Sequence, residues 1–568
     1  MRLLAALLVT TLTALTATAA PALTPFTASS GAPRAPEQLA MVFERADLQL
    51  RVDPRRRSIE GDAALTFRAA SALNRLAVEL DRNLRIRSIA VDGVAIARGQ
   101  WSNPDGRLFI TLPRPLAAGE TTTVRIRYGG KPHVAKRPPW DGGFVWKKTA
   151  DKQPWVATAV QGEGCDLFWP CIDHPLAEPK QVDLHVTVPA PLVAATNGVP
   201  MGMDEKNGWR TYHWRARNPN TYAIALNIGP YELLSDEYKS RFGNTIPLRF
   251  YYLKGNEAKA RELFAELPLM LDFYESTIGP YPFADEKLGI AETPHLGMEH
   301  QTINAYGNEF RKAPEGYDWL LHHELAHEWF GNQLTNTDWD DMWLHEGFGS
   351  YMQPLYLQYL YGDQMYFALL HRSRAGILNG APLVSGATRT EGDVYKKERG
   401  GPGGDIYAKG AHVLHTLRNL IGDQAFFESV RRLVYGTADP RPGNFTPRFS
   451  SSRELAQIVN QVTGRDYGWF FDVYVFAAAL PELVSTRDAT GLNLVWKTAE
   501  DRPFPMPVDV RVGDRVETLL MTDGRGQVAV PQGATFTIDP GSKILRHEPH
   551  VTAFQKYDEE QKKKAAKK

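Results

Sequence analysis

The chain has 568 residues, too many for one ordinary domain, and this length predicts about three domains. Hydrophobic residues make up 43% and aromatic residues 11% of the chain, which is enough for packed cores. Lys plus Arg and Asp plus Glu balance at 65 each. Because no net charge favours nucleic acid or an anionic membrane, we expect a globular protein without a nucleic-acid partner.

The first 20 residues are typical of an export signal. Arg2 precedes an apolar run over residues 3–15, and Ala17-Thr18-Ala19 is a small-x-small cleavage site. The run is too short and too rich in threonine for a stable membrane span. We expect residues 1–20 to be a cleaved signal peptide of a periplasmic or secreted protein that has no membrane span when mature. An uncleaved N-terminal anchor is the alternative.

The next part of the chain is expected to be a linker followed by strands. Residues 21–38 are rich in Pro, Ala and Ser, which is typical of a linker. Polar and apolar residues then alternate in short runs between Gly and Pro clusters, as in 47–52 (DLQLRV) and 182–188 (VDLHVTV). Such alternation indicates half-buried strands. We predict a mostly-β domain over residues 39–253.

Helical periodicity replaces the alternation near residue 254. Residues 257–273 show it, with an expected kink at Pro268. We predict a mainly helical domain over 254–478 and, where alternation returns, a small β-sandwich-like domain over 479–548. Residues 549–568 form a lysine-rich tail, expected to be solvated and disordered. The fold class is therefore multidomain α+β.

The chain contains only two cysteines, Cys165 and Cys171. This number excludes a framework of several disulfides. One bridge in an oxidising compartment and two buried free thiols both fit the sequence.

The strongest chemical pattern is the HExxH motif at His323-Glu324-Leu325-Ala326-His327. Residues four apart lie on one helix face, so both imidazoles can bind one ion. Asp318 is a candidate N-cap of this helix and Gly331 its candidate end. The bare motif also arises by chance in surface helices, but a catalytic zinc needs three protein ligands. Glu346, on a second helix returning beside the first, can be the third, which predicts one Zn²⁺ ion.

A carboxylate also follows a strand-like run before this helix. Glu299 lies in Leu296-Gly297-Met298-Glu299-His300 and could border the same cleft. Taken alone, however, Glu299 is better interpreted as an ordinary exposed acid.

These motifs together resemble the M1 family of zinc aminopeptidases, the gluzincins related to aminopeptidase N and leukotriene A4 hydrolase. The family pattern is HExxH, eighteen residues and then Glu, with Gly-x-Met-Glu-Asn before it and a tyrosine preceding Lys-Gly after it. This chain has HELAH and Glu346 at that spacing, LGMEH at 296–300, and Tyr407-Ala408-Lys409-Gly410. The resemblance extends over residues 48–483.

The resemblance implies a saddle-like N-terminal β domain, a thermolysin-like catalytic domain, and a role for each matching residue. His323, His327 and Glu346 would hold the zinc ion. Glu324 would be the general base that takes a proton from zinc-activated water, and Tyr407 would stabilise the oxyanion.

The resemblance also implies how substrate binds. Glu299 would bind the free α-ammonium group of a peptide, while Gly297 and Met298 would line the bound chain. A second anchor for the amine should be Gln161, which ungapped spacing favours, or Glu163, which charge complementarity favours; both stay open.

We therefore predict a zinc-dependent aminopeptidase that removes N-terminal residues from peptides with a free N-terminus. One alternative is a related zinc hydrolase with altered specificity, either an endopeptidase or an epoxide hydrolase. Another is a catalytically inactive binding module, against which the intact metal ligands and base argue. Leu296 and His300 depart from the family motif and leave the preferred N-terminal residue open. The sequence does not determine the oligomeric state.

Overall fold

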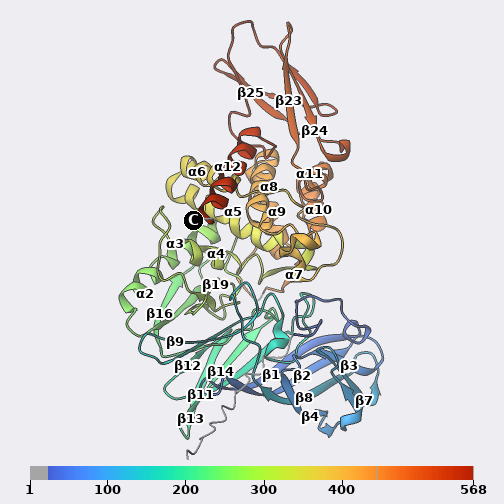
Figure 1. Cartoon of the computed structure of the whole chain (residues 1–568), viewed down its shortest axis with the longest axis vertical. Coiled ribbons are helices and arrows are strands. Elements are labelled where there is room, and N and C mark those ends of the chain that lie inside the picture. Colours follow the sequence, from blue (N-terminus) through green and yellow to red (C-terminus); the bar gives the residue numbers. More distant parts are fainter. Residues whose placement is uncertain (1–22, 444, 567–568) are drawn as a thin grey trace, which may run out of the picture.

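The computed structural model describes residues 23–443 and 445–566. A β domain from the N-terminal part lies at one end of the molecule, a helical domain in the middle and a small β domain at the other end (Figure 1). This arrangement confirms the predicted multidomain α+β class. The predicted signal peptide lies outside the described residues. Among the described helices, none combines the length and the apolar composition that crossing a bilayer requires.

The N-terminal domain is built on an eight-stranded sheet in which β1 and β11 run parallel. The predicted alternation is present in β1, where Ala46, Leu48 and Leu50 are buried and the residues between them are less so. In the order of the sheet, the strands are β13 (Val199–Lys206), β14 (Trp209–Arg217), β11 (Gln181–Pro189), β1 (Met41–Asp53), β2 (Ser58–Ala69), β8 (Thr121–Gly130), β4 (Leu84–Val91) and β5 (Val94–Ala95).

Two smaller sheets and one short helix complete this domain. One sheet contains β3 (Leu73–Glu79), β7 (Arg107–Leu116) and β6 (Trp101–Ser102), and the other contains β12 (Val193–Ala195), β15 (Asn227–Gly229), β10 (Pro154–Ala159) and β9 (Gly143–Lys148). The helix α1 (Pro36–Leu39) precedes β1.

A five-stranded sheet connects this domain to the helical one. Its order is β16 (Tyr231–Lys239), β17 (Thr245–Leu253), β18 (Leu288–Glu292), β20 (Asn304–Tyr306) and β19 (Gly297–Met298). Because β17 pairs with β18, this sheet continues across the domain boundary that we predicted at residue 253. The strand β19 ends one residue before Glu299, so the sheet positions that carboxylate.

The helical domain places the HExxH motif between packed helices. The predicted helix over 257–273 is divided in two, and Pro268 lies in the first turn of the second, where its missing N–H is not needed. The helices are α2 (Glu257–Phe264), α3 (Leu267–Thr277), α4 (Trp319–Ala326), α5 (Trp343–Tyr361), α6 (Asp363–Arg374), α7 (Glu391–Tyr395), α8 (Asp405–Ile421), α9 (Asp423–Tyr435), α10 (Ser452–Thr463) and α11 (Gly468–Tyr474), with a short sheet of β21 (Leu334–Asn336) and β22 (Arg448–Ser450).

The C-terminal domain consists of two three-stranded sheets, as the returning alternation predicts. One sheet contains β23 (Glu482–Arg487), β24 (Leu492–Lys497) and β27 (Arg525–Val528), and the other contains β26 (Arg515–Leu519), β25 (Val508–Val512) and β28 (Phe536–Ile538).

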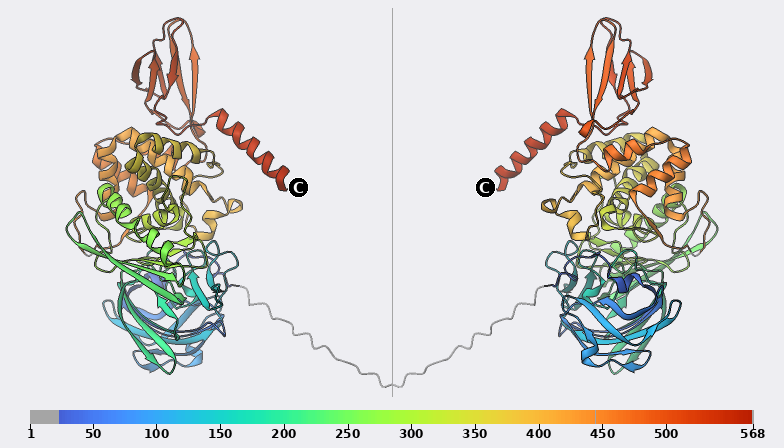
Figure 2. Two further views of the ribbon diagram at one scale, coloured as in Figure 1. Left: turned by 90° about the vertical axis from the view of Figure 1, so that its left-hand side faces the viewer. Right: turned by 90° about the vertical axis from the view of Figure 1, so that its right-hand side faces the viewer.

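The lysine-rich tail is a helix, so our expectation of disorder was wrong. Helix α12 (Pro549–Ala566) projects from the body of the molecule (Figure 2). Its sequence is rich in Glu, Gln, Lys and Ala, which favour helix, and Pro549 stands at its first position, where proline is tolerated. Ion pairs of 2.6 Å join Asp558 to Lys562 and Glu559 to Lys563, each four residues apart.

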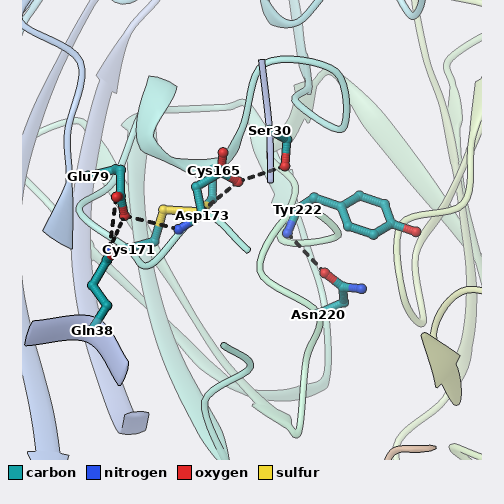
Figure 3. The surroundings of a disulfide bond; sticks show 8 residues. All are labelled: Ser30, Gln38, Glu79, Cys165, Cys171, Asp173, Asn220 and Tyr222. Carbon is teal, nitrogen blue, oxygen red and sulfur yellow. Dashed lines mark hydrogen bonds between the residues drawn. A yellow bond between two sulfur atoms is a disulfide. The ribbon is translucent and has the colours of Figure 1, made fainter. Parts of the chain in front are cut away.

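Cys165 and Cys171 form a disulfide, which decides between the two states that the sequence left open. The bridge lies among buried carboxylates (Figure 3). The Glu79 carboxylate accepts hydrogen bonds of 2.8 and 2.7 Å from the Gln38 amide, and it also accepts one from the backbone N–H of Asp173 at 3.2 Å. The bridge closes a turn within the loop that follows β10, and the bond from Asp173 to Glu79 fastens that loop to β3.

Another buried carboxyl group beside the disulfide belongs to Asp166. It is completely buried, and neither carboxylate oxygen has a hydrogen-bond partner among the described residues. Burial, followed by the charge of Asp173, raises the pKa of Asp166 well above its ordinary value. The folded protein therefore holds a proton that the unfolded chain has lost above about pH 4. The stability that this group contributes must fall as the pH rises from there toward the folded pKa.

Asp166→Asn is expected to remove this pH-dependent loss, because an amide does not ionise. The melting temperature of the variant relative to the native protein should rise as the pH increases from about 4 up to the folded pKa of Asp166. Thermal unfolding across that range measures the trend. Asp514→Asn, on an exposed turn between β25 and β26, is the matched control and should show no such slope. An Asp166→Asn difference that is constant with pH would contradict the account.

Candidate metal centre and substrate cavity

The HExxH motif lies on α4 and in the turn that follows it. Asp318 caps the helix as predicted, since its carboxylate accepts a 2.9 Å hydrogen bond from the backbone N–H of Leu321. The helix ends earlier than the expected Gly331: Ala326 is its last residue and His327 is its C-cap. The turn lets the His327 Nδ1–H donate to the Phe330 carbonyl at 2.8 Å. This bond leaves the Nε2 lone pair of His327 free for a metal ion.

Three ligand atoms converge where α4 faces α5. The Nε2 atoms of His323 and His327 are 3.3 Å apart, and Glu346 Oε2 lies 3.4 and 3.5 Å from them. Tetrahedral zinc with bonds of about 2.0–2.2 Å separates its ligands by about 3.3–3.5 Å. Among the described residues, these three alone form a group of His, Cys, Asp or Glu that could hold a metal.

The protonation of the triad also fits one divalent cation. Glu346 Oε2 is buried without a hydrogen-bond partner among the described residues. Burial by itself would lower the pKa of His327, but the adjacent Glu346 carboxylate raises it to about 10. The carboxylate thus attracts positive charge into a buried site, and a zinc ion supplies that charge without a proton. We conclude that the residues fit a single Zn²⁺ ion, as the sequence predicts.

Two glycines set the distance between the helices that carry Glu346 and Tyr407. A Cβ on Gly347 of α5 would lie 3.1 Å from the Cα of Gly410 of α8, and one on Gly410 would lie 2.8 Å from the Cα of Gly347. This backbone contact brings the Tyr407 hydroxyl within 2.9 Å of Glu346 Oε1, to which it donates. Burial, followed by the charge of Glu346, keeps the pKa of Tyr407 well above its ordinary value, so the hydroxyl remains a donor.

Glu324 points into the space beside the triad, as expected for a base. It is 6% exposed, and burial, followed by the charge of Glu299, raises its pKa. Gly297 makes room for it, since a Cβ at that position would lie 2.4 Å from Glu324 Oε1. Gly297 and Met298 line the same cavity, where β19 runs alongside α4.

Glu299 is buried in the cavity wall and held by two side chains. Gln161 donates to Glu299 Oε1 from its amide, and the Tyr222 hydroxyl donates to the same oxygen at 3.0 Å. Of the two candidate anchors, Gln161 is therefore the one in contact with Glu299. Glu163 lines the cavity too, but its carboxylate accepts from the backbone N–H of Gly142 instead. Asn332 also donates to the Glu299 carbonyl at 3.1 Å, which fixes the main chain.

Tyr222, Tyr395 and Glu391 belong to the site but could not be predicted from the sequence. The Tyr395 hydroxyl lies 3.2 Å from that of Tyr407, and Glu391 is a buried acid of the cavity. None of the three stands in a motif of recognised spacing. Only tertiary contact reveals them.

The triad, Glu324, Glu299 and Tyr407 line one cavity of about 760 Å³ between the N-terminal and helical domains. Its volume is in the range typical of ligand pockets. The metal triad, Glu324 and Tyr407 lie on the helical side, while Gln161 and Glu163 come from the N-terminal domain. The cavity therefore joins a metal centre to a carboxylate suited to binding a cation.

Comparison with protein families gives two matches. The family model described as "Peptidase M1 N-terminal domain" matches residues 42–222, and the one described as "Peptidase family M1 domain" matches residues 307–461. Together they cover more than half of the chain and include the triad, Glu324 and Tyr407.

Individual relatives agree with these matches. Leukotriene A-4 hydrolase of Xenopus laevis is 26% identical over 332 residues, which are 56% of this chain and 52% of that protein. The crystal structure of a mutant M1 zinc metallopeptidase from Deinococcus radiodurans is 28% identical with a TM-score of 0.66, covering 80% of this chain and 98% of that one. The same protein bound to a Tyr-Ser-Ala substrate has a TM-score of 0.65. The chain spans about half the length of the curated relatives it matches.

Loss of a triad residue is expected to abolish tight zinc binding. His327→Ala and Glu346→Gln each remove one of the three ligands. Loss of a group that merely hydrogen-bonds to a ligand already costs about 10–100-fold in metal affinity, so zinc affinity should fall by at least about 100-fold. Zinc content of the purified protein and competition with a chelator measure this. Glu324→Gln leaves all three ligands in place and should retain one zinc per chain. Full zinc content in His327→Ala would contradict the assignment.

Gly410→Ala is expected to destabilise the protein by about 1–3 kcal/mol, because the new methyl group overpacks the contact with Gly347. Thermal and urea unfolding measure the loss. Gly404→Ala at the start of the same helix is the control, since its Cβ would meet no atom within 4 Å and its φ of −63° suits alanine. Equal stability of the two variants would show that the helices are not in close contact.

Proposed function

This chain belongs to peptidase family M1, and we propose that it is a zinc-dependent aminopeptidase that removes N-terminal residues from peptides. The observation that carries the proposal is the position of Glu299. Its carboxylate lies 4% exposed in the same cavity as the metal triad and Glu324. The α-ammonium group of a peptide is largely protonated at neutral pH and is the cation that this carboxylate would bind.

The hydrogen bonds to Glu299 leave one oxygen available for the substrate. Gln161 and Tyr222 both donate to Oε1, and Oε2 accepts no hydrogen bond among the described residues. A substrate ammonium group would bind at Oε2, while the fixed Oε1 keeps the carboxylate in place. A buried carboxylate favours a charged terminus over an internal, uncharged peptide bond, which makes the enzyme an exopeptidase.

A zinc ion, when bound, supplies a Lewis acid that lowers the pKa of water and polarises the substrate carbonyl. The chain's own groups move the protons. Glu324 accepts a proton from the attacking water and returns it to the leaving amine nitrogen. Its raised pKa, caused by burial and by Glu299, suits a group that must hold that proton between the two transfers.

Tyr407 supplies the donor for the charge that develops on the substrate carbonyl oxygen. Its hydroxyl stays protonated and is already directed toward the triad through Glu346 Oε1. Rotation of the hydroxyl from Glu346 to the substrate oxygen would stabilise the oxyanion, an effect worth roughly 3 kcal/mol in comparable sites. Tyr395, 3.2 Å from the Tyr407 hydroxyl, supports its orientation.

The binding of a Tyr-Ser-Ala substrate by the Deinococcus radiodurans structure supports peptides as substrates of this chain. The alternatives from the sequence are an endopeptidase, an epoxide hydrolase and an inactive binding module. The intact triad, base and tyrosine disfavour the last of these. The buried carboxylate at the amine position disfavours an endopeptidase, because an internal peptide bond would leave that charge unpaired.

We further propose that the protein is exported and works in the periplasm or outside the cell. The disulfide between Cys165 and Cys171 supports this location, because such bonds persist in oxidising compartments and are rare in the cytosol.

A free α-amino group is expected to be required for cleavage. Alanyl and leucyl fluorogenic amides should be hydrolysed, their N-acetylated forms should not, and a chelator should stop the reaction until zinc is restored. Glu299→Ala should lower kcat/KM on the free-amine substrates by at least about 30-fold, as expected for truncation of a buried charged pair. Glu262→Ala, exposed on α2, is the control. Equal cleavage of acetylated and free substrates would refute the exopeptidase assignment.

A further inference from the structure

The segment that we predicted as a linker is built into the wall of the substrate cavity. We call residues 24–35 the N-terminal strap. The backbone N–H of Ser30 donates to the Gly162 carbonyl, and the Ser30 carbonyl accepts from the N–H of Glu391, both at 2.9 Å. The strap thus runs between the loop that carries Gln161 and the start of α7. It precedes residues 42–222, so it lies outside both matched family regions.

Close packing and side-chain contacts hold the strap in this position. The Ser30 hydroxyl donates to Asp173 at 2.9 Å beside the disulfide (Figure 3). The backbone N–H of Gly392 donates to the Ser29 hydroxyl at 2.9 Å. Gly31 has a φ of +82°, and a Cβ there would lie 2.1 Å from the Trp339 ring. Only glycine therefore fits at this position of the strap. The strap therefore fixes the main chain of α7 on the cavity wall.

Glu391, the residue fixed in this way, presents a buried carboxylate to the cavity. It is 7% exposed, and its carboxylate has no hydrogen bond or ion pair among the described residues. Its oxygens lie 3.4 and 4.0 Å from the position that a Cβ on Gly162 would occupy. Gly162 directly follows the amine anchor Gln161, so this carboxylate lies within a side chain's reach of the bound N-terminus.

A second acid, Glu163, faces the same part of the cavity. Its carboxylate contacts only the backbone N–H of Gly142, and no ion pair involves it within the described part of the chain. Burial, followed by the charge of Glu163, raises the pKa of Glu391 to about 8. Lys396 also lines the cavity and offsets part of this charge without forming an ion pair with either acid. Glu163 and Glu391 thus form an acidic subsite beside the amine anchor.

We infer that this acidic subsite binds the positively charged side chain of an N-terminal arginine or lysine, and that the strap positions Glu391 for this contact. The inference rests on the proposed aminopeptidase function and names its substrate class. The side chain of the N-terminal residue and its ammonium group leave the same Cα. With the ammonium at Glu299, the side chain lies beside Gly162, where Glu391 is unpaired.

A substrate cation suits this subsite better than a second metal ion or a neutral side chain. Glu163 and Glu391 do not belong to any metal-binding group among the described residues. A guanidinium or ammonium group would restore the paired state that a buried carboxylate requires, through charge-assisted hydrogen bonds. A neutral side chain of the same length would leave both acids without a partner.

The test compares arginyl with citrullyl fluorogenic amides, because citrulline has nearly the shape of arginine without its charge. For the native enzyme we expect kcat/KM to favour arginine by about tenfold or more, the usual effect of a hydrogen bond to a charged group. An alanyl substrate, assayed in parallel, reports the proposed function separately. Hydrolysis of alanine amide with equal rates on arginine and citrulline would overturn the subsite alone. No hydrolysis of any of the three would refute the aminopeptidase function itself.

Two variants test whether Glu391 and Glu163 cause the expected preference for arginine over citrulline. Glu391→Gln and Glu163→Gln each remove one charge at constant shape, and each should lower the arginine-to-citrulline ratio by about fivefold or more. Asp393→Asn is the matched control, because Asp393 also lies on α7 but pairs with Arg399 at the surface. It should leave the ratio unchanged. A fall in activity that is equal for arginine and citrulline in Glu391→Gln would assign Glu391 to amine binding and overturn the inference.

The strap has its own test. Ser29→Ala removes the acceptor of the Gly392 N–H and should lower the same ratio, by less than Glu391→Gln does and mainly through KM for arginine. Ser276→Ala, which removes a hydroxyl bonded to the Phe273 carbonyl on α3, is the control for loss of a serine side chain. If Ser29→Ala and Ser276→Ala give the same ratio as the native enzyme, the strap does not position Glu391.

Discussion

The backbone contact between α5 and α8 at Gly347 and Gly410 is the constraint on which the site depends. It brings two helices closer than side chains would allow. One residue from the first glycine stands Glu346, and three residues from the second stands Tyr407. The contact therefore places a metal ligand and a hydrogen-bond donor 2.9 Å apart without any direct link in sequence. Since α4 also packs against α5, the two histidines complete the same cluster.

Buried negative charge is the second feature that organises the molecule. Glu299, Glu324, Glu346 and Glu391 are each 4–7% exposed and face one cavity. Buried carboxylates are costly unless a cation or proton accompanies them. Each therefore requires a positive partner or a proton: a metal ion at Glu346, a proton at Glu324 and, in our proposals, a substrate ammonium group at Glu299 and a basic side chain at Glu391. The fold gathers acids that a zinc ion and, as we propose, the substrate neutralise, which would link stability of the cavity to binding.

Local patterns predicted much of the fold and the metal ligands, but not the rest of the site. The alternation in 47–52 predicted a strand because every second side chain there is buried. HExxH predicted two ligands because residues four apart share a helix face. The choice between Gln161 and Glu163 needed the structure, since only the loop geometry turns Gln161 toward Glu299 and Glu163 toward Gly142. The linker prediction for 21–38 missed the strap, because its contacts are with residues 162 and 391, far away in the chain.

The sequence by itself determined the order of the β and helical domains and the three residues of the metal triad, while the role of Glu324 as base stays a prediction. The strands and the two histidines follow from spacing within single elements, where periodicity and covalent geometry relate one residue to the next, and Glu346 follows from its spacing after the HExxH motif. Only the tertiary structure decided that Tyr222 and Gln161 hold Glu299, that Tyr395 lies beside Tyr407, and that the strap and Glu391 line the cavity. Those contacts join segments tens to hundreds of residues apart. Their geometry depends on how helices and sheets pack against each other, which no local pattern encodes.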